Sequence, residues 1–227
     1  MSRIIIGDVH GTYKTLLALV AQFPKDVPIT FCGDLIDRGP DSRSVMEFVY
    51  AGGHDCVLGN HEVMMITELK FKDGKVIPPS YYDSCWLGNG GDKCLDNYVV
   101  EGGYDDKTLK HYVDWLSKLP YHILYDEVNS KGEKLLVTHS TAAEVWDEYS
   151  PENPVFQNFV LWERNNFPPK IDGIFNVYGH TPQKDGPTIK GHFANIDTGA
   201  VFKRGPYGKL TGLQWPEMIV YEQEYCE

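Results

Sequence analysis

The chain has few cysteines and none of the close pairs that hold disulfides or structural zinc. Its 227 residues include five cysteines, which is an odd number, and no C-x-x-C pair. We therefore expect no disulfide framework, and we infer a reducing compartment. Cys32 and Cys56 fall in apolar runs, where an unmodified cysteine behaves as a small buried hydrophobic residue.

Long hydrophobic runs are missing as well. The first apolar run, residues 4–6, stops at Gly7 and Asp8 and is too short for a signal peptide or a membrane span. We therefore expect a cytoplasmic protein with no membrane partner. The sequence carries no signal of its oligomeric state.

The chain also lacks an excess of positive charge. Lysine and arginine number 21 against 32 aspartates and glutamates, which gives a net charge of −11. Proteins that bind long nucleic acid usually present a basic face, so we do not expect long nucleic acid as a partner. Phosphorylated proteins and small nucleotides stay open, because bound divalent cations would reverse the local field of an acidic site.

Three segments in the first third of the chain share one pattern: an apolar run, a glycine and then a polar side chain. The runs at residues 3–6, 27–32 and 55–58 lead into Gly7-Asp8-Val9-His10-Gly11, Gly33-Asp34-Leu35-Ile36-Asp37-Arg38-Gly39 and Gly59-Asn60-His61-Glu62. The spacing from Asp8 to Asp34 equals that from Asp34 to Asn60, which suits successive parallel strands joined by helices. Ligands bind at the carboxyl ends of strands connected in this way.

The rest of the chain divides into an irregular segment, a helix and a strand-rich half. Residues 71–104 are rich in glycine and predict a lid-like segment, in which residues 86–91 either bring aromatic surface near the site or form a surface loop anchored by Trp86. Residues 105–119 predict an amphipathic helix, and residues 155–164 predict another. Strands are predicted at residues 121–128, 134–138, 174–178, 193–197, 201–202, 210–214 and 218–221. We expect two packed sheets with helices outside.

Six side chains that follow apolar runs offer oxygen or imidazole nitrogen, and none offers a thiolate. They are Asp8, His10, Asp34, Asn60, His139 and His180. A lone histidine at a strand end is usually a structural residue, but six residues in matching positions indicate a common site. Mixed oxygen and nitrogen ligands suit Mn²⁺, Fe or Zn²⁺.

These segments resemble the signature blocks of a known family. G-D-V-H-G, G-D-L-I-D-R-G and G-N-H-E are similar to the three blocks of the phosphoprotein phosphatase family of metallophosphoesterases. Y-G-H-T-P at 178–182 and I-D-T-G-A-V-F at 196–202 most resemble the bacteriophage lambda serine/threonine phosphatase and its bacterial relatives. The resemblance implies one calcineurin-like domain over residues 1–227. The implied fold class is α/β (α+β), a four-layer αββα sandwich with two mixed sheets flanked by helices.

The resemblance also implies two divalent metal ions, with Mn²⁺ the leading expectation and Fe or Zn as alternatives. The implied ligands are Asp8, His10 and Asp34 for the first metal, and Asn60, His139 and His180, with Asp34 shared, for the second. Two metals can activate a hydroxide that bridges them for in-line attack on phosphorus. No nucleophilic serine or cysteine is then needed.

The remaining roles that the resemblance implies concern the phosphate and the leaving group. Arg38 and Arg164 would clamp the phosphate oxygens with their planar guanidinium groups, and Asn60 would assist in binding substrate. His61 would protonate the leaving alkoxide and would be oriented by Asp37. The simpler interpretation of Arg38 is a surface partner of nearby acids, and Arg164 depends on the short run L-W-E-R at 161–164.

The function that the resemblance implies is a metal-dependent protein serine/threonine phosphatase. The alternative is a dinucleoside polyphosphate hydrolase of the diadenosine-tetraphosphatase type, or a broad-specificity phosphoesterase. Such hydrolases tend to carry alanine where this chain has Asp37, which favours the phosphomonoesterase. A binding protein without activity would lack a ligand or the acid, and here every expected position is filled. We expect Glu62 to cap or orient the helix after Asn60, and Asp197 to be a structural carboxylate or a neighbour of the ligands rather than a ligand itself.

Overall fold

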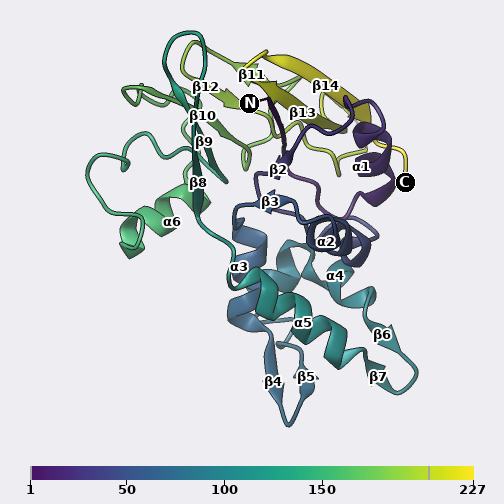
Figure 1. Cartoon of the computed structure of the whole chain (residues 1–227). Helices are drawn as coiled ribbons and strands as arrows, with labels where there is room; N and C mark the ends of the chain where they lie inside the picture. Colours follow the sequence, from purple (N-terminus) through teal and green to yellow (C-terminus); the bar gives the residue numbers. More distant parts are fainter. Residues whose placement is uncertain (1, 204) are drawn as a thin grey trace.

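The computed structural model describes residues 2–203 and 205–227 and contains two five-stranded sheets packed against each other (Figure 1). The first sheet has the order β14-β13-β1-β2-β3. Its strands are β1 (Arg3–Ile6), β2 (Ile29–Phe31), β3 (Asp55–Cys56), β13 (Lys209–Trp215) and β14 (Ile219–Glu224). The first three strands are parallel, and β13 and β14 extend the sheet in antiparallel pairing.

The second sheet has the order β11-β12-β10-β9-β8. Its strands are β8 (His122–Val128), β9 (Lys134–Thr138), β10 (Ile174–Tyr178), β11 (Thr188–Ile189) and β12 (Phe193–Asn195). The central strands β9, β10 and β12 are parallel, and an antiparallel strand closes each edge. Both sheets are therefore mixed, as predicted.

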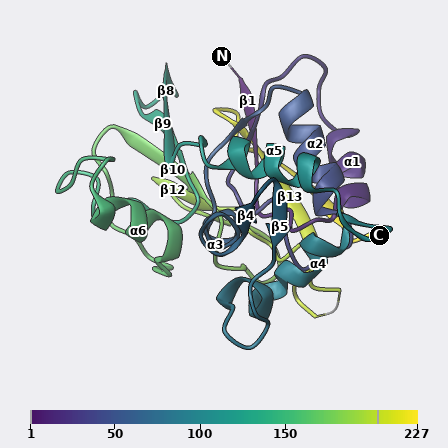
Figure 2. The same ribbon diagram turned by 90° about the horizontal axis from the view of Figure 1, so that it is seen from below.

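Helices cover the outer face of each sheet, which gives four layers. On the first sheet, α1 (Tyr13–Val20) and α2 (Ser42–Ala51) pack on the face to which Ile4 and Ile6 of β1 point. Ile5 points the other way, into the apolar core between the sheets, so the isoleucine run is buried on both faces. On the second sheet, α6 (Pro154–Trp162) packs outside β9 and β10, and Figure 2 shows α6 far from α1 and α2. The αββα arrangement is confirmed.

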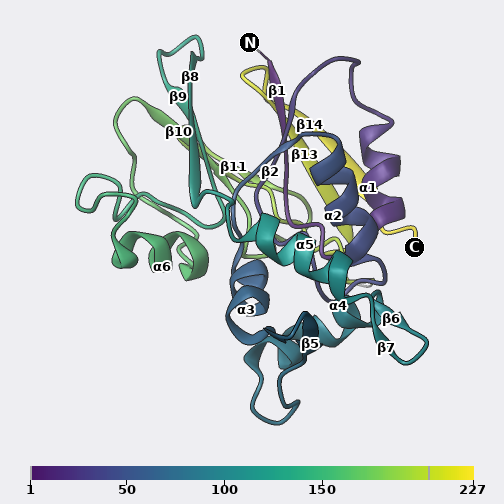
Figure 3. The same ribbon diagram turned by 60° about the horizontal axis from the view of Figure 1, so that its bottom comes forward.

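A smaller helical region lies beyond the ends of the sheets (Figure 3). It contains α3 (Asn60–Glu68), α4 (Asp92–Asp96) and α5 (Asp106–Leu116). The predicted amphipathic helix is α5, which Asp105 caps by accepting a bond from the N–H of Thr108 at 3.3 Å. Its apolar face is buried. None of the described helices is long and apolar enough to cross a membrane.

The segment from residue 71 to 104 is more ordered than predicted. It includes the hairpins β4 (Lys70–Lys72) with β5 (Lys75–Ile77) and β6 (Val99–Val100) with β7 (Gly103–Tyr104), a π-helical turn η1 (Leu87–Gly91) and α4. These pieces are too short to produce a detectable periodicity. The predicted lid-like role of this segment stays a prediction.

Two strand assignments in the second half differ from the sequence prediction. Residues 201–202 do not form a strand, because the N–H of Phe202 bonds back to the carbonyl of Gly199 at 2.9 Å and closes a turn. The edge strand β11 was not predicted, because its two residues are too few to show an alternating pattern.

Candidate metal and phosphate site

The predicted ligands come together at the carboxyl ends of parallel strands from both sheets. Asp8, Asp34 and Asn60 follow β1, β2 and β3, whereas His139 and His180 follow β9 and β10. The side chains are all buried, with at most 6% of any of these residues exposed. The site therefore lies at the junction of the two sheets.

Two groups of side chains present ligand atoms close enough together for a cation. Among the described residues, one group is His10, Asp34 and His61, and the other is Asp34, His139 and His180. Within each group the ligand atoms lie within 4.8 Å of one another. Asp34 belongs to both groups, which is the position that a bridging carboxylate requires.

Backbone carbonyls fix the orientation of two of the imidazoles. Nδ1 of His139 lies 2.8 Å from the carbonyl oxygen of Cys32, and Nδ1 of His10 lies 2.8 Å from that of Ile36. A carbonyl oxygen only accepts, so Nδ1 carries the proton and donates. The lone pair of His139 Nε2 is then available to a cation, whereas Nε2 of His10 accepts a hydrogen bond from Nη1 of Arg38 at 2.8 Å in this structure.

The atoms at the centre of the second group fit a divalent cation. Nε2 of His139 lies 2.9 Å from Oδ1 of Asn60 and 3.5 Å from Oδ1 of Asp34. Nδ1 of His180 is 3.1 Å from the same Asn60 oxygen. With Nε2 of His139 unprotonated, its lone pair faces acceptor oxygens, and a cation among them would remove that repulsion.

Burial and mutual charge place these ligands in the protonation states that a cation needs. Burial lowers the pKa of His10 and of His139, and burial followed by the neighbouring His139 lowers the pKa of His180 to about 3. Burial alone would raise the pKa of Asp34, but the surrounding histidines lower it below its ordinary value. The neutral imidazoles of His10, His139 and His180 therefore lie beside an ionised carboxylate.

Asp8 lies at the edge of the site and bonds to the second sheet. Its two carboxylate oxygens accept from the N–H of His180 at 3.1 and 3.2 Å. A Cβ at Gly179 would lie 2.0 Å from Oδ1 of Asp8, which explains the glycine before His180. Asp8 belongs to neither clustered group, so its predicted role as a metal ligand stays a prediction.

His61 and Asp37 form a buried pair suited to proton donation. Nδ1 of His61 lies 2.6 Å from Oδ2 of Asp37, and both side chains are almost fully buried. Burial lowers the pKa of His61, but the charges of Asp34 and Asp37 raise it more, so it lies above its ordinary value. Nε2 of His61 faces Asp34, 3.9 Å from Oδ2. This is the arrangement expected of a general acid held by a carboxylate.

The two predicted arginines lie at different depths. Arg38 is half-buried, and its Nη1 lies 2.8 Å from Nε2 of His10, so its guanidinium points into the site. Arg164 follows α6 and is exposed, and its charge helps to lower the pKa of His180 and opposes the rise in that of Asp197. Both arginines thus lie near the cluster, and their phosphate contacts stay predictions.

Several site residues adopt a backbone conformation that is unusual for residues other than glycine. Positive φ values between 47° and 73° occur at His10, Asp34, Asp37, Arg38 and His180. Such conformations cost about 1–3 kcal/mol each and persist only where the surrounding structure enforces them, most often at functional sites. Their concentration here supports the assignment of the site.

Asp197 is an acidic side chain of the site that the sequence predicts to be structural. It is buried, and it follows β12 at the same end of the second sheet as His139 and His180. Burial raises its pKa to about 7, while the N–H of Gly199, which bonds to Oδ1 at 2.8 Å, opposes the rise. That local bond is what a structural carboxylate would make.

Trp86 makes a contact in the site that the sequence did not predict. Its side chain is fully buried, and its indole Nε1 lies 3.0 Å from both carboxylate oxygens of Asp37. Trp86 thus lies near the site, as one of the two predictions for residues 86–91 has it, and it is buried, as the alternative of an anchoring tryptophan requires. The sequence signal for this contact was the glycine pair after it, because a Cβ at Gly91 would lie 2.5 Å from the indole ring.

Glu62 ties together the loops that carry Asp34 and Asn60. Its carboxylate accepts from the N–H groups of Asp34 at 2.9 Å, Leu35 at 2.8 Å and Gly59 at 3.0 Å. Burial, followed by the charge of Asp34, raises the pKa of Glu62 to about 8, and these N–H groups oppose the rise. Gly59 is the N-cap residue of α3, so the predicted capping role is confirmed.

We expect Glu62→Ala to lower the free energy of unfolding by at least about 3 kcal/mol. Three buried N–H groups would lose their acceptor, at a cost of about 1–3 kcal/mol each. Urea denaturation followed by circular dichroism measures the change. The exposed Glu101→Ala serves as the control, and a loss no greater than that of the control would contradict this account.

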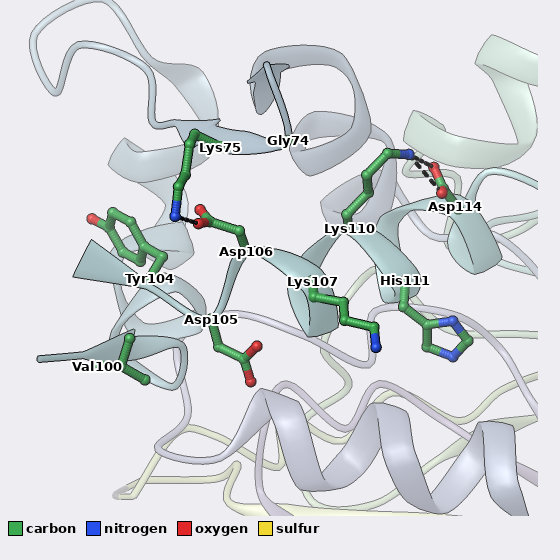
Figure 4. Close-up of a pocket in the computed structure, with 10 residues that line it drawn as sticks. All are labelled: Gly74, Lys75, Val100, Tyr104, Asp105, Asp106, Lys107, Lys110, His111 and Asp114. Carbon is green, nitrogen blue, oxygen red and sulfur yellow. Dashed lines mark hydrogen bonds and ion pairs between the residues drawn. The ribbon is translucent and has the colours of Figure 1, made fainter. Parts of the chain in front are cut away.

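A separate cavity lies in the helical region (Figure 4). It has a volume of about 800 Å³ and lies between α5 and the two hairpins. Its lining charges are largely paired, with Lys75 2.8 Å from Asp106 and Lys110 2.6 Å from Asp114. None of the predicted site residues lines it.

Comparison with known proteins places the chain in a family. Residues 1–197 match the family described as calcineurin-like phosphoesterase. The asymmetrical bis(5′-nucleosyl)-tetraphosphatase PrpE of Bacillus cereus is 28% identical, over 96% of this chain and 92% of that protein. Serine/threonine-protein phosphatase 2 of Escherichia coli is 27% identical, over 86% of each chain. A protein serine/threonine phosphatase from Saccharomyces cerevisiae has a similar fold, with a TM-score of 0.62 at 16% identity over 100% of this chain and 81% of that one. The chain belongs to the calcineurin-like phosphoesterase family.

Proposed function

We propose that the protein is a metal-dependent phosphatase that removes phosphate from phosphoserine and phosphothreonine in proteins. The observation that carries the proposal is the buried pair of His61 and Asp37, with 2.6 Å between Nδ1 and Oδ2. An alkoxide leaving group needs a proton as the P–O bond breaks. A nucleotide that leaves a dinucleoside polyphosphate departs as a phosphate anion and needs a proton far less. The pair therefore favours phosphomonoesters with alkoxide leaving groups.

Metal binding, phosphate orientation and proton donation are assigned to different residues of this chain. Bound divalent cations, for which Mn²⁺ is our first choice, would supply Lewis-acid activation of water and offset charge on the phosphate. Asp34, His139, His180 and Asn60 would hold them, with Asp8 and His10 as further proposed ligands. Arg38 and Arg164 orient the phosphate oxygens. His61 delivers its Nε2 proton to the leaving oxygen while Asp37 holds Nδ1.

A second function is supported by the likeness to PrpE, which extends over 96% of this chain. In that case the substrate is a dinucleoside polyphosphate, and the same ligands and arginines act on an anhydride bond. The two functions place different demands on His61. They can therefore be separated by comparing substrates.

A parallel assay with Mn²⁺ tests the proposal. We expect kcat/KM for a phosphoserine peptide to exceed that for a phosphotyrosine peptide and that for diadenosine tetraphosphate. Released phosphate or nucleotide is measured, with chelator-treated protein as the control for metal dependence. A higher kcat/KM for diadenosine tetraphosphate would overturn the proposal in favour of the second function.

A further inference from the structure

The turn after residue 84 is anchored to the end of α3. Ser84 donates its hydroxyl to the carboxylate of Glu68, and the backbone N–H of Trp86 lies 3.2 Å from Oε1 of the same residue. The hydroxyl of Ser84 also accepts from the N–H of Leu87 at 2.9 Å. These bonds fix the backbone from which the Trp86 side chain enters the core.

The indole of Trp86 completes the hydrogen bonding of the Asp37 carboxylate. Within the described chain, the donors to that carboxylate are Nδ1 of His61 at 2.6 Å and Nε1 of Trp86, which is 3.0 Å from each oxygen. Burial raises the pKa of Asp37, and both hydrogen bonds oppose the rise. A buried carboxylate with two donors has one orientation, whereas a carboxylate with one donor can rotate.

We propose that Trp86 is a positioning residue for proton transfer, because its indole N–H fixes the Asp37 carboxylate that aligns His61. This inference rests on the proposed role of His61 as the general acid. Gly91 belongs to the same arrangement, since any side chain there would displace the indole. The segment at residues 71–104 thus contacts the proposed catalytic pair through the buried side chain of Trp86.

The same turn also positions Arg38 through its backbone. The N–H of Arg38 donates to the carbonyl of Gly90 at 3.1 Å. A Cβ at Gly90 would lie 2.8 Å from Cγ and 2.9 Å from the nitrogen of Arg38. Trp86 contacts Asp37, whereas Gly90 contacts Arg38, for which a different role is proposed. Substitutions at Trp86 and at Gly90 should therefore change activity in different ways.

The test compares Trp86→Phe with Trp215→Phe on two synthetic phosphomonoesters. Phenyl phosphate has a leaving group that needs a proton more than that of p-nitrophenyl phosphate, and neither depends on the identity of the natural substrate. We expect Trp86→Phe to lower kcat for phenyl phosphate about tenfold, with kcat for p-nitrophenyl phosphate and both KM values changed less than about twofold. Trp215 is equally buried, but its Nε1 has no partner among the described residues, so Trp215→Phe controls for lost packing.

Two further variants separate positioning from general damage. Gly90→Ala is expected to lower activity on both substrates alike, because under the proposed function Arg38 would contact the phosphate rather than the leaving group. Trp86→Phe in a His61→Asn background is expected to cause no additional loss. Thermal melting shows whether each variant is folded.

The outcomes separate a failure of the inference about Trp86 from a failure of the proposed role of His61. Equal losses on both substrates for Trp86→Phe, or additional loss in the His61→Asn background, would overturn the positioning role of Trp86. If His61→Asn is selective for the leaving group and Trp86→Phe is not, only the inference fails. If His61→Asn shows no selectivity, the acid assignment fails and the inference falls with it.

Discussion

Asp34→Asn is expected to abolish metal binding and activity together. One carboxylate takes part in both clustered groups, and its pKa lies below the ordinary value. An amide has one oxygen and no charge, so it cannot bridge two cations. We expect kcat/KM to fall by about three orders of magnitude or more, because cations stabilise the transition state by several kcal/mol. Metal content is measured by mass spectrometry and activity with p-nitrophenyl phosphate.

Asp172→Asn is a matched control for this experiment, because the Asp172 side chain is fully exposed. It should bind metal and turn over substrate as the unchanged protein does. Circular dichroism shows whether the Asp34→Asn chain is folded. Retention of two equivalents of metal by folded Asp34→Asn protein would contradict the bridging role.

His61→Asn is expected to affect phosphoserine peptides far more than p-nitrophenyl phosphate. Loss of general-acid catalysis costs about 10²- to 10⁴-fold when the leaving group is an alkoxide. Nitrophenolate is stable without a proton and should leave at a nearly unchanged rate. The measurement is kcat on both substrates at one pH and one metal concentration.

His111→Asn serves as the control, because His111 is exposed on α5 and lies outside the clustered groups. Its two kcat values should match those of the unchanged protein. Comparable losses on both substrates for His61→Asn would show that the residue binds phosphate or metal instead of donating a proton.

The positions of the candidate ligands could be predicted from the sequence because strand ends are local features. An apolar run that leads into glycine and a polar residue specifies both a buried strand and the side chain at its end, as at Asp8, Asp34 and Asn60. Parallel connectivity then brings those residues to one edge. The layers could be predicted from the same runs, because Ile5 and its neighbours can be buried on two faces only between two layers.

Contacts between segments far apart in the chain could not be predicted from the sequence. Trp86 meets Asp37 across 49 positions, and the carbonyl of Cys32 meets His139 across 107 positions. A periodic pattern in the sequence does not indicate which backbone carbonyl will accept a hydrogen bond from an imidazole. The short hairpins were missed for the opposite reason, since two or three residues per strand are too few to show alternation.

The bond between Asp8 and His180 joins residues 172 positions apart and two different sheets. Because the candidate ligands also come from both sheets, ions held there would bind the assembled sandwich and not the unfolded chain. Such binding would stabilise the fold by about 4 kcal/mol at a thousandfold excess over Kd. The supply of metal would then determine how much of the protein accumulates as well as how fast it turns over substrate. Without metal, more of the chain would be unfolded and open to proteolysis.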